Sequence, residues 1–140
     1  MKILLPVDGS EYTKRMLGYV AAHEELFGSG HEFVFATVVA PVPPHVTRFV
    51  DHATLRGYYD DAAAEVLSPA EKFAAQHGWT ARSLHLVGQA AETLAQLAKA
   101  ENFDLILMGS HGHSALGNIV LGSVATGVLA RCTVPVLLIR

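Results

Sequence analysis

The sequence has few of the features that define several protein classes. Its single cysteine, Cys132, cannot form a disulfide within the chain, so we expect a reducing, cytoplasmic setting. Ten Lys plus Arg against thirteen Asp plus Glu give a net charge of −3, which argues against a nucleic-acid-binding face. No apolar run approaches the ~18–20 residues of a membrane helix, and we expect no secretory leader. The 51% apolar content over 140 residues instead predicts one folded domain spanning 1–140.

Two common phosphate-binding signatures are also missing. No G-x-G-x-x-G occurs, and Gly112–Asn118 has the outer glycine spacing of a P-loop with Asn118-Ile119 where Lys-Ser/Thr is needed. Without that lysine we expect no efficient NTPase of the P-loop class. The eight histidines show no convergent ligand spacing, and no serine lies in a nucleophile-elbow context, so we predict neither a dedicated metal site nor a catalytic residue.

The hydrophobic pattern predicts strands that alternate with helices. Apolar runs predict five strands, and helical spacing predicts four helices around a proline-rich loop at 40–50. Ser68-Pro69 predicts a kink or restart in the longest helix, because proline cannot donate to the preceding turn. The crossovers predict an α/β fold, a parallel sheet with helices on both faces. The expected strands are 2–7, 31–39, 80–87, 104–109 and 134–140, and the expected helices are 12–27, 55–74, 90–101 and 120–129.

Sheets of this kind bind ligands beyond the carboxyl ends of their strands, where the strand order reverses. Gly109-Ser110-His111-Gly112 directly follows the fourth predicted strand, and Gly122-Ser123 comes nine residues later, where the last helix begins. Glycines and a helix N-terminus offer backbone N–H groups to a phosphate. The alternative is that these glycines only shape two loops.

Asp8 follows the first predicted strand and has two interpretations. Its carboxylate could accept hydrogen bonds from a nucleoside across the cleft from the glycine loop. It could also cap the first helix, since both Asp8 and Ser10 are favoured cap residues.

Several motifs together resemble those of the universal stress protein family. They are Val7-Asp8-Gly9-Ser10, Thr37-Val38-Val39, the G-x₂-G-x₉-G-S segment that begins at Gly109, and the terminal apolar run from Val134 to Ile139. The glycine spacing matches the ATP-binding subgroup of that family, and the resemblance covers the whole chain. It implies a Rossmann-like sheet, similar to the adenine nucleotide alpha hydrolases, with strand order 3-2-1-4-5.

The resemblance also implies roles for individual residues around ATP, or AMP or ADP, with Mg²⁺ or Mn²⁺ between the phosphates. The adenine slot would be lined by Pro6, Val7 and Val38, and Asp8 would hold the nucleoside as well as acting as a cap. Ribose and the first phosphates would follow Met108, Gly109, His111 and Gly112, and the outer phosphates would meet Gly122, Ser123, Val124 and Ala125. Ala125 departs from the family, because many ATP binders carry Ser or Thr there.

Three functions fit these observations. The first is a stress-response regulatory protein that binds ATP and hydrolyses it slowly or not at all; the second is a nucleotide-free interaction dimer. The third, an enzyme acting on an adenylylated substrate, lacks a visible general base.

The last strand also predicts an assembly. Strand 134–140 is apolar and carries a proline, which fits a sheet edge. The family resemblance implies that two copies meet there in a homodimer. Alternatively, the loop 40–50 covers that edge.

Overall fold

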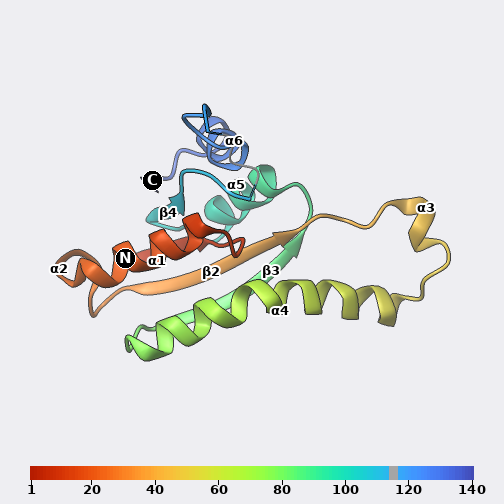
Figure 1. The fold of residues 1–140 in the computed structure, drawn as a ribbon, viewed down its shortest axis with the longest axis horizontal. Helices are drawn as coiled ribbons and strands as arrows, with labels where there is room; N and C mark the ends of the chain where they lie inside the picture. The colour runs from red at the N-terminus through yellow and green to blue at the C-terminus, as the bar shows by residue number, and fades with distance from the viewer. Residues whose placement is uncertain (114–116) are drawn as a thin grey trace.

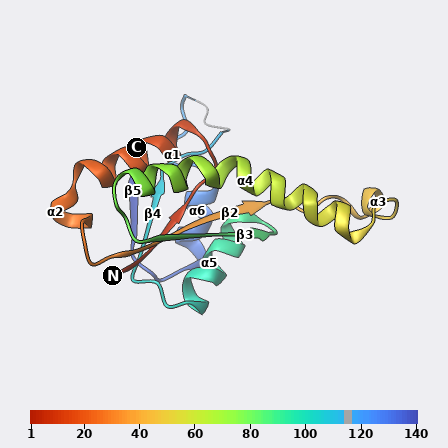
Figure 2. The same ribbon diagram turned by 90° about the horizontal axis from the view of Figure 1, so that it is seen from below.

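The structure is a computed structural model, which describes residues 1–113 and 117–140. Its centre is a five-stranded parallel sheet in the order β3-β2-β1-β4-β5, as expected, with helices on both faces (Figures 1 and 2). The strands are β1 (Lys2–Pro6), β2 (Glu32–Val39), β3 (Ala81–Val87), β4 (Leu105–Gly109) and β5 (Val136–Ile139). The helices are α1 (Glu11–Ala22), α2 (Glu24–Phe27), α3 (Pro44–Thr47), α4 (His52–Gln76), α5 (Ala90–Ala100) and α6 (Ser123–Arg131).

The core is divided between the two faces of the sheet, because successive side chains of a strand point to opposite faces. Ile3 and Leu5 of β1 pack with α1 and α4, whereas Leu4, between them, packs with α5 and α6. Ile3, Leu4 and Leu5 are all fully buried. This two-sided burial explains why the strands read as continuous apolar runs.

Several element boundaries differ from the sequence predictions. The first helix breaks at His23, where its Nδ1 lies 2.8 Å from the Tyr19 carbonyl, so the predicted span 12–27 becomes α1 and α2. The last helix begins at Ser123 rather than at residue 120. The last strand begins at Val136 rather than at residue 134, although the Pro135 carbonyl still accepts from the Ile106 N–H at 2.8 Å. Residues 114–116, which fall within the glycine spacing of Gly112–Asn118, lie outside the described residues.

The sequence predicts a kink or a restart of the longest helix at Ser68, and the restart is wrong. Helix α4 continues through Pro69, beginning at an N-cap in which Asp51 accepts from the Thr54 N–H at 2.7 Å. Proline removes one hydrogen bond of this helix. Leu67 and Ala70 on either side are buried in the core against the sheet, and this packing keeps the two halves in one continuous helix.

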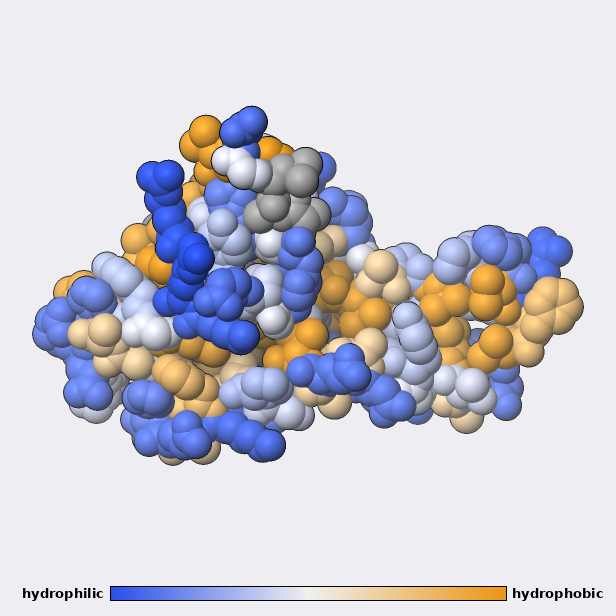
Figure 3. Space-filling model, viewed as in Figure 1, coloured by the Kyte–Doolittle hydropathy of each residue, from blue (hydrophilic) through white to orange (hydrophobic). Residues whose placement is uncertain are grey.

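The segment 40–51 does not cover the last strand. It extends away from β5 and, together with α3 and the first half of α4, forms an arm beyond the β3 side of the sheet (Figures 1 and 2). Tyr59 ties the arm together, since its hydroxyl accepts from the Val42 N–H at 2.9 Å. The arm exposes apolar surface (Figure 3), with Phe49 89% exposed. The alternative in which this loop shields the β5 edge is therefore excluded.

Within residues 1–113 and 117–140, no helix has both the length and the hydropathy to cross a membrane.

Candidate functional site

A cavity of about 360 Å³ opens at the carboxyl ends of β1, β2 and β4, where the strand order reverses. Its walls come from these strand ends, the loop after β4, and the first turns of α5 and α6. The structure brings all twelve residues of the predicted site to this one cavity. They are Pro6, Val7, Asp8, Val38, Met108, Gly109, His111, Gly112, Gly122, Ser123, Val124 and Ala125.

Asp8 is held at the edge of this cavity by the chain that follows β1. Its Oδ1 accepts from the Ser10 N–H and from the Thr13 hydroxyl, both at 2.9 Å, and its own N–H donates to Thr13 Oγ1 at 3.1 Å. The N-cap position of α1 belongs to Ser10, whose side chain makes no capping bond. Asp8 therefore organises the turn before the helix rather than capping the helix itself, and its Oδ2 faces Gly112.

The apolar end of the cavity contains an unpaired part of β2. The Ala36 carbonyl accepts from the Val7 N–H at 2.9 Å, whereas the Val39 carbonyl accepts from the Gly88 N–H at 3.0 Å. Backbone groups of a strand alternate between its two neighbours, so those of Val38 point to the β1 side. There β1 has already ended, and the Val38 N–H and C=O have no hydrogen-bond partner in the described part of the chain. One donor and one acceptor thus face the cavity side by side.

The opposite end of the cavity is built from backbone rather than from charged side chains. Gly122 is the N-cap of α6, and its N–H donates to the Ser110 carbonyl at 2.7 Å. A Cβ at Gly122 would lie 3.0 Å from that carbonyl oxygen, so the two loops pack at the distance that only glycine allows comfortably. The first turn of α6 lines the cavity, and the N-terminal turn of a helix attracts anions through its free N–H groups and its dipole.

Two histidines fix the loop after β4. Nε2 of His113 lies 2.6 Å from the Asp8 carbonyl, and Nε2 of His111 lies 2.6 Å from the Ile119 carbonyl. Carbonyls only accept, so both Nε2 atoms carry the proton. Nδ1 of His111 lies 2.8 Å from Ser110 Oγ. The loop is therefore tied to the end of β1 and to the segment before α6.

The cavity has little charge of its own. Among its described lining residues, the ionisable side chains are those of Asp8, His111 and His113, and none is a lysine or arginine. Within the described residues, no three His, Cys, Asp or Glu side chains are grouped to hold a metal ion. An anion at the glycine end would therefore be bound mainly by backbone N–H groups.

Several lining residues were not among the predicted site residues. They are Thr13, Ala36, Thr37, Ala90, Leu94, His113 and Ile119. Helix α5 contributes Ala90 and Leu94 through its position against β2, which no local motif reveals. Thr37 and His113 adjoin predicted residues in the sequence, so adjacency alone would have indicated them.

Comparison with known proteins places this cavity in context. The universal stress protein family model matches residues 1–140. A universal stress protein of Thermus aquaticus is 33% identical over 143 residues, which cover 99% of this chain and 97% of that protein. Universal stress protein Slr1230 of Synechocystis is 29% identical, and the chain spans only 42% of its length.

Solved structures share the fold. That of protein MJ0577, a universal stress protein of Methanocaldococcus jannaschii, has a TM-score of 0.79 and 29% identity and covers 99% of this chain and 94% of its own. A family protein from Arabidopsis thaliana, solved with AMP bound, has a TM-score of 0.71 at 14% identity. It covers 99% of this chain and 90% of its own.

Proposed function

The chain belongs to the universal stress protein family, and we propose that it is a stress-response regulatory protein that binds ATP in the cavity at the β1–β4 opening. In this proposal, adenine occupies the apolar end beside Pro6, Val7 and Val38. The phosphates lie at the glycine end against the first turn of α6, and Asp8 contacts the nucleoside between them.

The observation that carries this proposal is the free backbone pair of Val38. The Watson–Crick edge of adenine presents an N6 amino donor beside an N1 acceptor, which complements a backbone C=O beside an N–H. Guanine presents the reverse pattern at the same edge, so this pair favours adenine. The AMP bound to the Arabidopsis protein is consistent with an adenine nucleotide in this fold.

The phosphate end supports anion binding without strong electrostatics. The first turn of α6 supplies the Ser123 hydroxyl and the N–H groups of Ser123, Val124 and Ala125, which have no acceptor among the described residues. We propose that Mg²⁺ or Mn²⁺ accompanies the phosphates. The oxygen donors of this cavity suit such hard cations, with Asp8 as the one carboxylate among the described lining residues. The cation would be held mainly by the nucleotide and would neutralise charge on the phosphates.

Hydrolysis in this site should be slow or absent. Asp8, the one carboxylate among the described lining residues, has an oxygen committed to Ser10 and Thr13, and no described lysine or arginine lines the glycine end to stabilise a departing phosphate. Phosphoryl transfer depends mainly on such positioned charges. Binding that changes a regulated partner therefore fits the cavity better than turnover.

We further propose a homodimer that pairs through β5. Pro135 and Ile139 accept hydrogen bonds from the β4 segment, so the backbone groups of Val136 and Leu138 point away from β4. Those groups have no partner in the part of the chain that is described, and an exposed strand edge of this kind is a template for pairing. We also propose a cytoplasmic location, because the only cysteine, Cys132, is buried and has no second cysteine with which to form a disulfide within the chain.

Titration calorimetry with adenosine, AMP, ADP, ATP and GTP, each with Mg²⁺, tests the nucleotide site. We expect ATP to bind and GTP to bind much more weakly. Val38→Pro removes the N–H that points into the cavity and also fixes φ at this position, whereas the matched variant Val38→Ala keeps the N–H. Adenosine binding should be lost in Val38→Pro and retained in Val38→Ala. Equal binding of adenosine by the two variants would show that adenine is not read at this position.

A further inference from the structure

A second recess lies behind His111 and is chemically unlike the nucleotide cavity. It has a volume of about 470 Å³, and its walls come from α1, the loop after β4 and the residue that follows β5. We call it the basic recess; it is lined by Tyr12, Arg15, Ser110, His111, Gly117, Ile119 and Arg140. It shares His111 and Ile119 with the nucleotide cavity, so the 2.6 Å contact between these two residues forms the wall between the two spaces.

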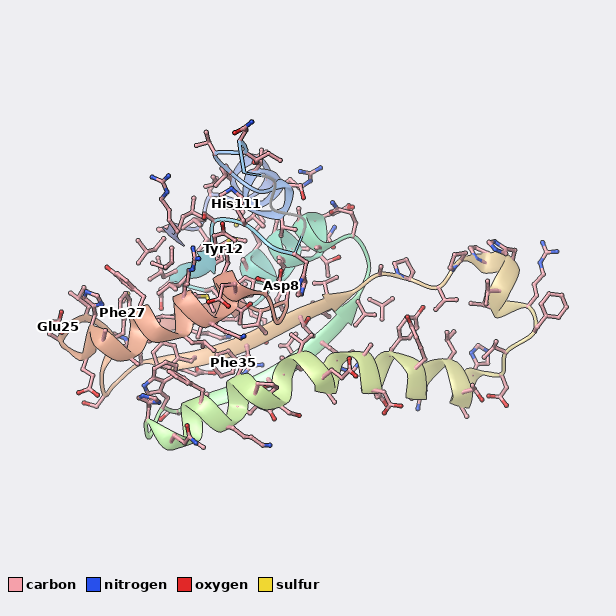
Figure 4. The ribbon with its side chains drawn as sticks, in the orientation of Figure 1. Asp8, Tyr12, Glu25, Phe27, Phe35 and His111 are labelled. Carbon is pink, nitrogen blue, oxygen red and sulfur yellow. The ribbon has the colours of Figure 1, made fainter. Side chains whose placement is uncertain are left out.

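Contacts between several elements form the basic recess. The rings of Tyr12 and His111 lie 4.9 Å apart (Figure 4), and the Arg15 guanidinium lies 5.0 Å from the centre of the Tyr12 ring. A guanidinium over an aromatic face is attracted by the ring quadrupole. On the other wall, the Ser110 N–H donates to the Ile139 carbonyl at 2.8 Å, which brings the following residue, Arg140, to the same recess.

The recess carries two arginine side chains that pair with no Asp or Glu side chain of the described residues. Among the described residues, no Asp or Glu carboxylate lies within 4.0 Å of the Arg15 or the Arg140 guanidinium. Glu11, one turn before Arg15 on α1, pairs instead with Lys14 at 3.7 Å. In a chain with a net charge of −3, two arginines that share a recess with no Asp or Glu side chain among its described lining residues are a local excess of positive side-chain charge.

We propose that the basic recess binds a phosphate group between Arg15 and Arg140, with the Tyr12 hydroxyl as a further donor. Guanidinium groups present paired N–H donors that match the oxygens of phosphate, and their charge strengthens each hydrogen bond. The group could come from free phosphate or pyrophosphate, or from a nucleotide whose outer phosphates pass the His111 wall. This proposal does not depend on adenine recognition, because none of its donors lies at the adenine end of the nucleotide cavity.

Calorimetry with inorganic pyrophosphate is the direct test. We expect the wild-type protein to bind pyrophosphate at low ionic strength and to bind it more weakly as salt screens the arginines. The double variant Arg15→Gln/Arg140→Gln should bind at least about tenfold more weakly, since hydrogen bonds to charged groups are the strong ones. Lys72→Gln is the matched control, because Lys72 is exposed on α4 and lines neither space, and it should bind as the wild type does.

A competition experiment separates the two sources of phosphate. If saturating ATP but not AMP displaces pyrophosphate in an arginine-dependent way, the recess receives the outer phosphates of the nucleotide. If pyrophosphate binds equally with and without ATP, the recess takes a separate anion. Both results support the proposal. Pyrophosphate affinity that is absent in the wild type, or unchanged in the double variant, overturns it. If the wild-type protein binds pyrophosphate in an arginine-dependent way but does not bind adenosine, only the proposed nucleotide function is refuted.

Discussion

Asp8→Asn separates the structural role of Asp8 from its proposed role in ligand binding. The amide can keep its oxygen at the Oδ1 position, where it still accepts from the Ser10 N–H and the Thr13 hydroxyl. The amide nitrogen then replaces Oδ2, the atom that faces Gly112 in the cavity and has no donor from the described part of the protein. A ligand hydroxyl loses its charged acceptor, while the turn before α1 keeps its hydrogen bonds.

The expected size of this effect follows from the bond that is lost. A hydrogen bond to a charged group contributes about 1.5–3 kcal/mol, so adenosine should bind about 10- to 140-fold more weakly to Asp8→Asn. Adenosine is the right probe because it is neutral, and its affinity therefore does not change with the repulsion between Asp8 and a phosphate. Asp8→Ala removes both structural bonds as well and should destabilise the fold by about 2 kcal/mol, read as a lower thermal midpoint.

The matched control is Asp104→Asn. Asp104 also accepts a backbone hydrogen bond, from the Lys2 N–H at 2.7 Å, but it precedes β4 and so lies at the opposite edge of the sheet from the cavity. Its substitution should leave adenosine affinity unchanged. Calorimetry and circular dichroism on the three variants check both readouts. If Asp8→Asn binds adenosine within about twofold of the wild type, Oδ2 makes no ligand contact and Asp8 is a turn residue only.

Three further predictions concern other parts of the chain. Ala125→Ser adds a hydroxyl to the first turn of α6, so ATP should bind up to about tenfold more tightly by calorimetry, the gain of one neutral hydrogen bond; no gain would mean that the phosphates do not reach this turn. Leu138→Pro removes an N–H that points away from β4, so in sedimentation this variant should be a folded monomer rather than a dimer. Leu137→Pro instead breaks the β4–β5 ladder and should lower the stability of the fold. A wild-type protein that sediments as a monomer at high micromolar concentration refutes the dimer. The hydrogen bond from the Thr54 N–H lowers the pKa of Asp51 from its ordinary 3.8, so the capping bond is at full strength above pH 3.8 and weakens as the pH falls through the lowered pKa. Protection of the Thr54 amide from hydrogen exchange should therefore decline as the pH falls below 3.8, and it should also be lower in Asp51→Ala at neutral pH. Unchanged protection in the variant would contradict the role of the cap.

Much of the fold and the cavity was predictable because the relevant signals are local. Each strand of a parallel sheet is a short apolar run, and the carboxyl ends of such strands meet at one edge, so motifs that follow different strands converge. Asp8 and the glycines from Gly109 onward were predicted to lie at one cavity on this basis, whereas Val38 was added only by the family resemblance. The family resemblance supplied the strand order, which periodicity alone does not determine.

The features that the sequence did not reveal depend on tertiary packing. Pro69 reads as a helix break, but burial of the residues on either side outweighs the loss of one hydrogen bond. The basic recess joins Arg15 to Arg140, which lie near opposite ends of the sequence and share no motif. The proline-rich sequence around α3 predicts an irregular loop, but it does not predict where the arm lies relative to the sheet.

The opening of the cavity at the carboxyl ends of β1, β2 and β4 is set by backbone chemistry at the end of β1. Lys2 and Leu4 pair with β4, as shown by the Asp104 N–H that donates to the Lys2 carbonyl at 2.9 Å, so the backbone of Pro6 also points toward β4. Proline has no N–H to offer there, and the register between β1 and β4 ends at Leu4 with Ile106. On the other side of β1, the chain turns away at Asp8 and leaves the Val38 backbone pair unmatched. A proline on one side and an early turn on the other therefore open the central strand to both neighbours at the place where the strand order reverses. The same few residues that end β1 thus create the space for a ligand and leave beside it the backbone groups that would recognise its base.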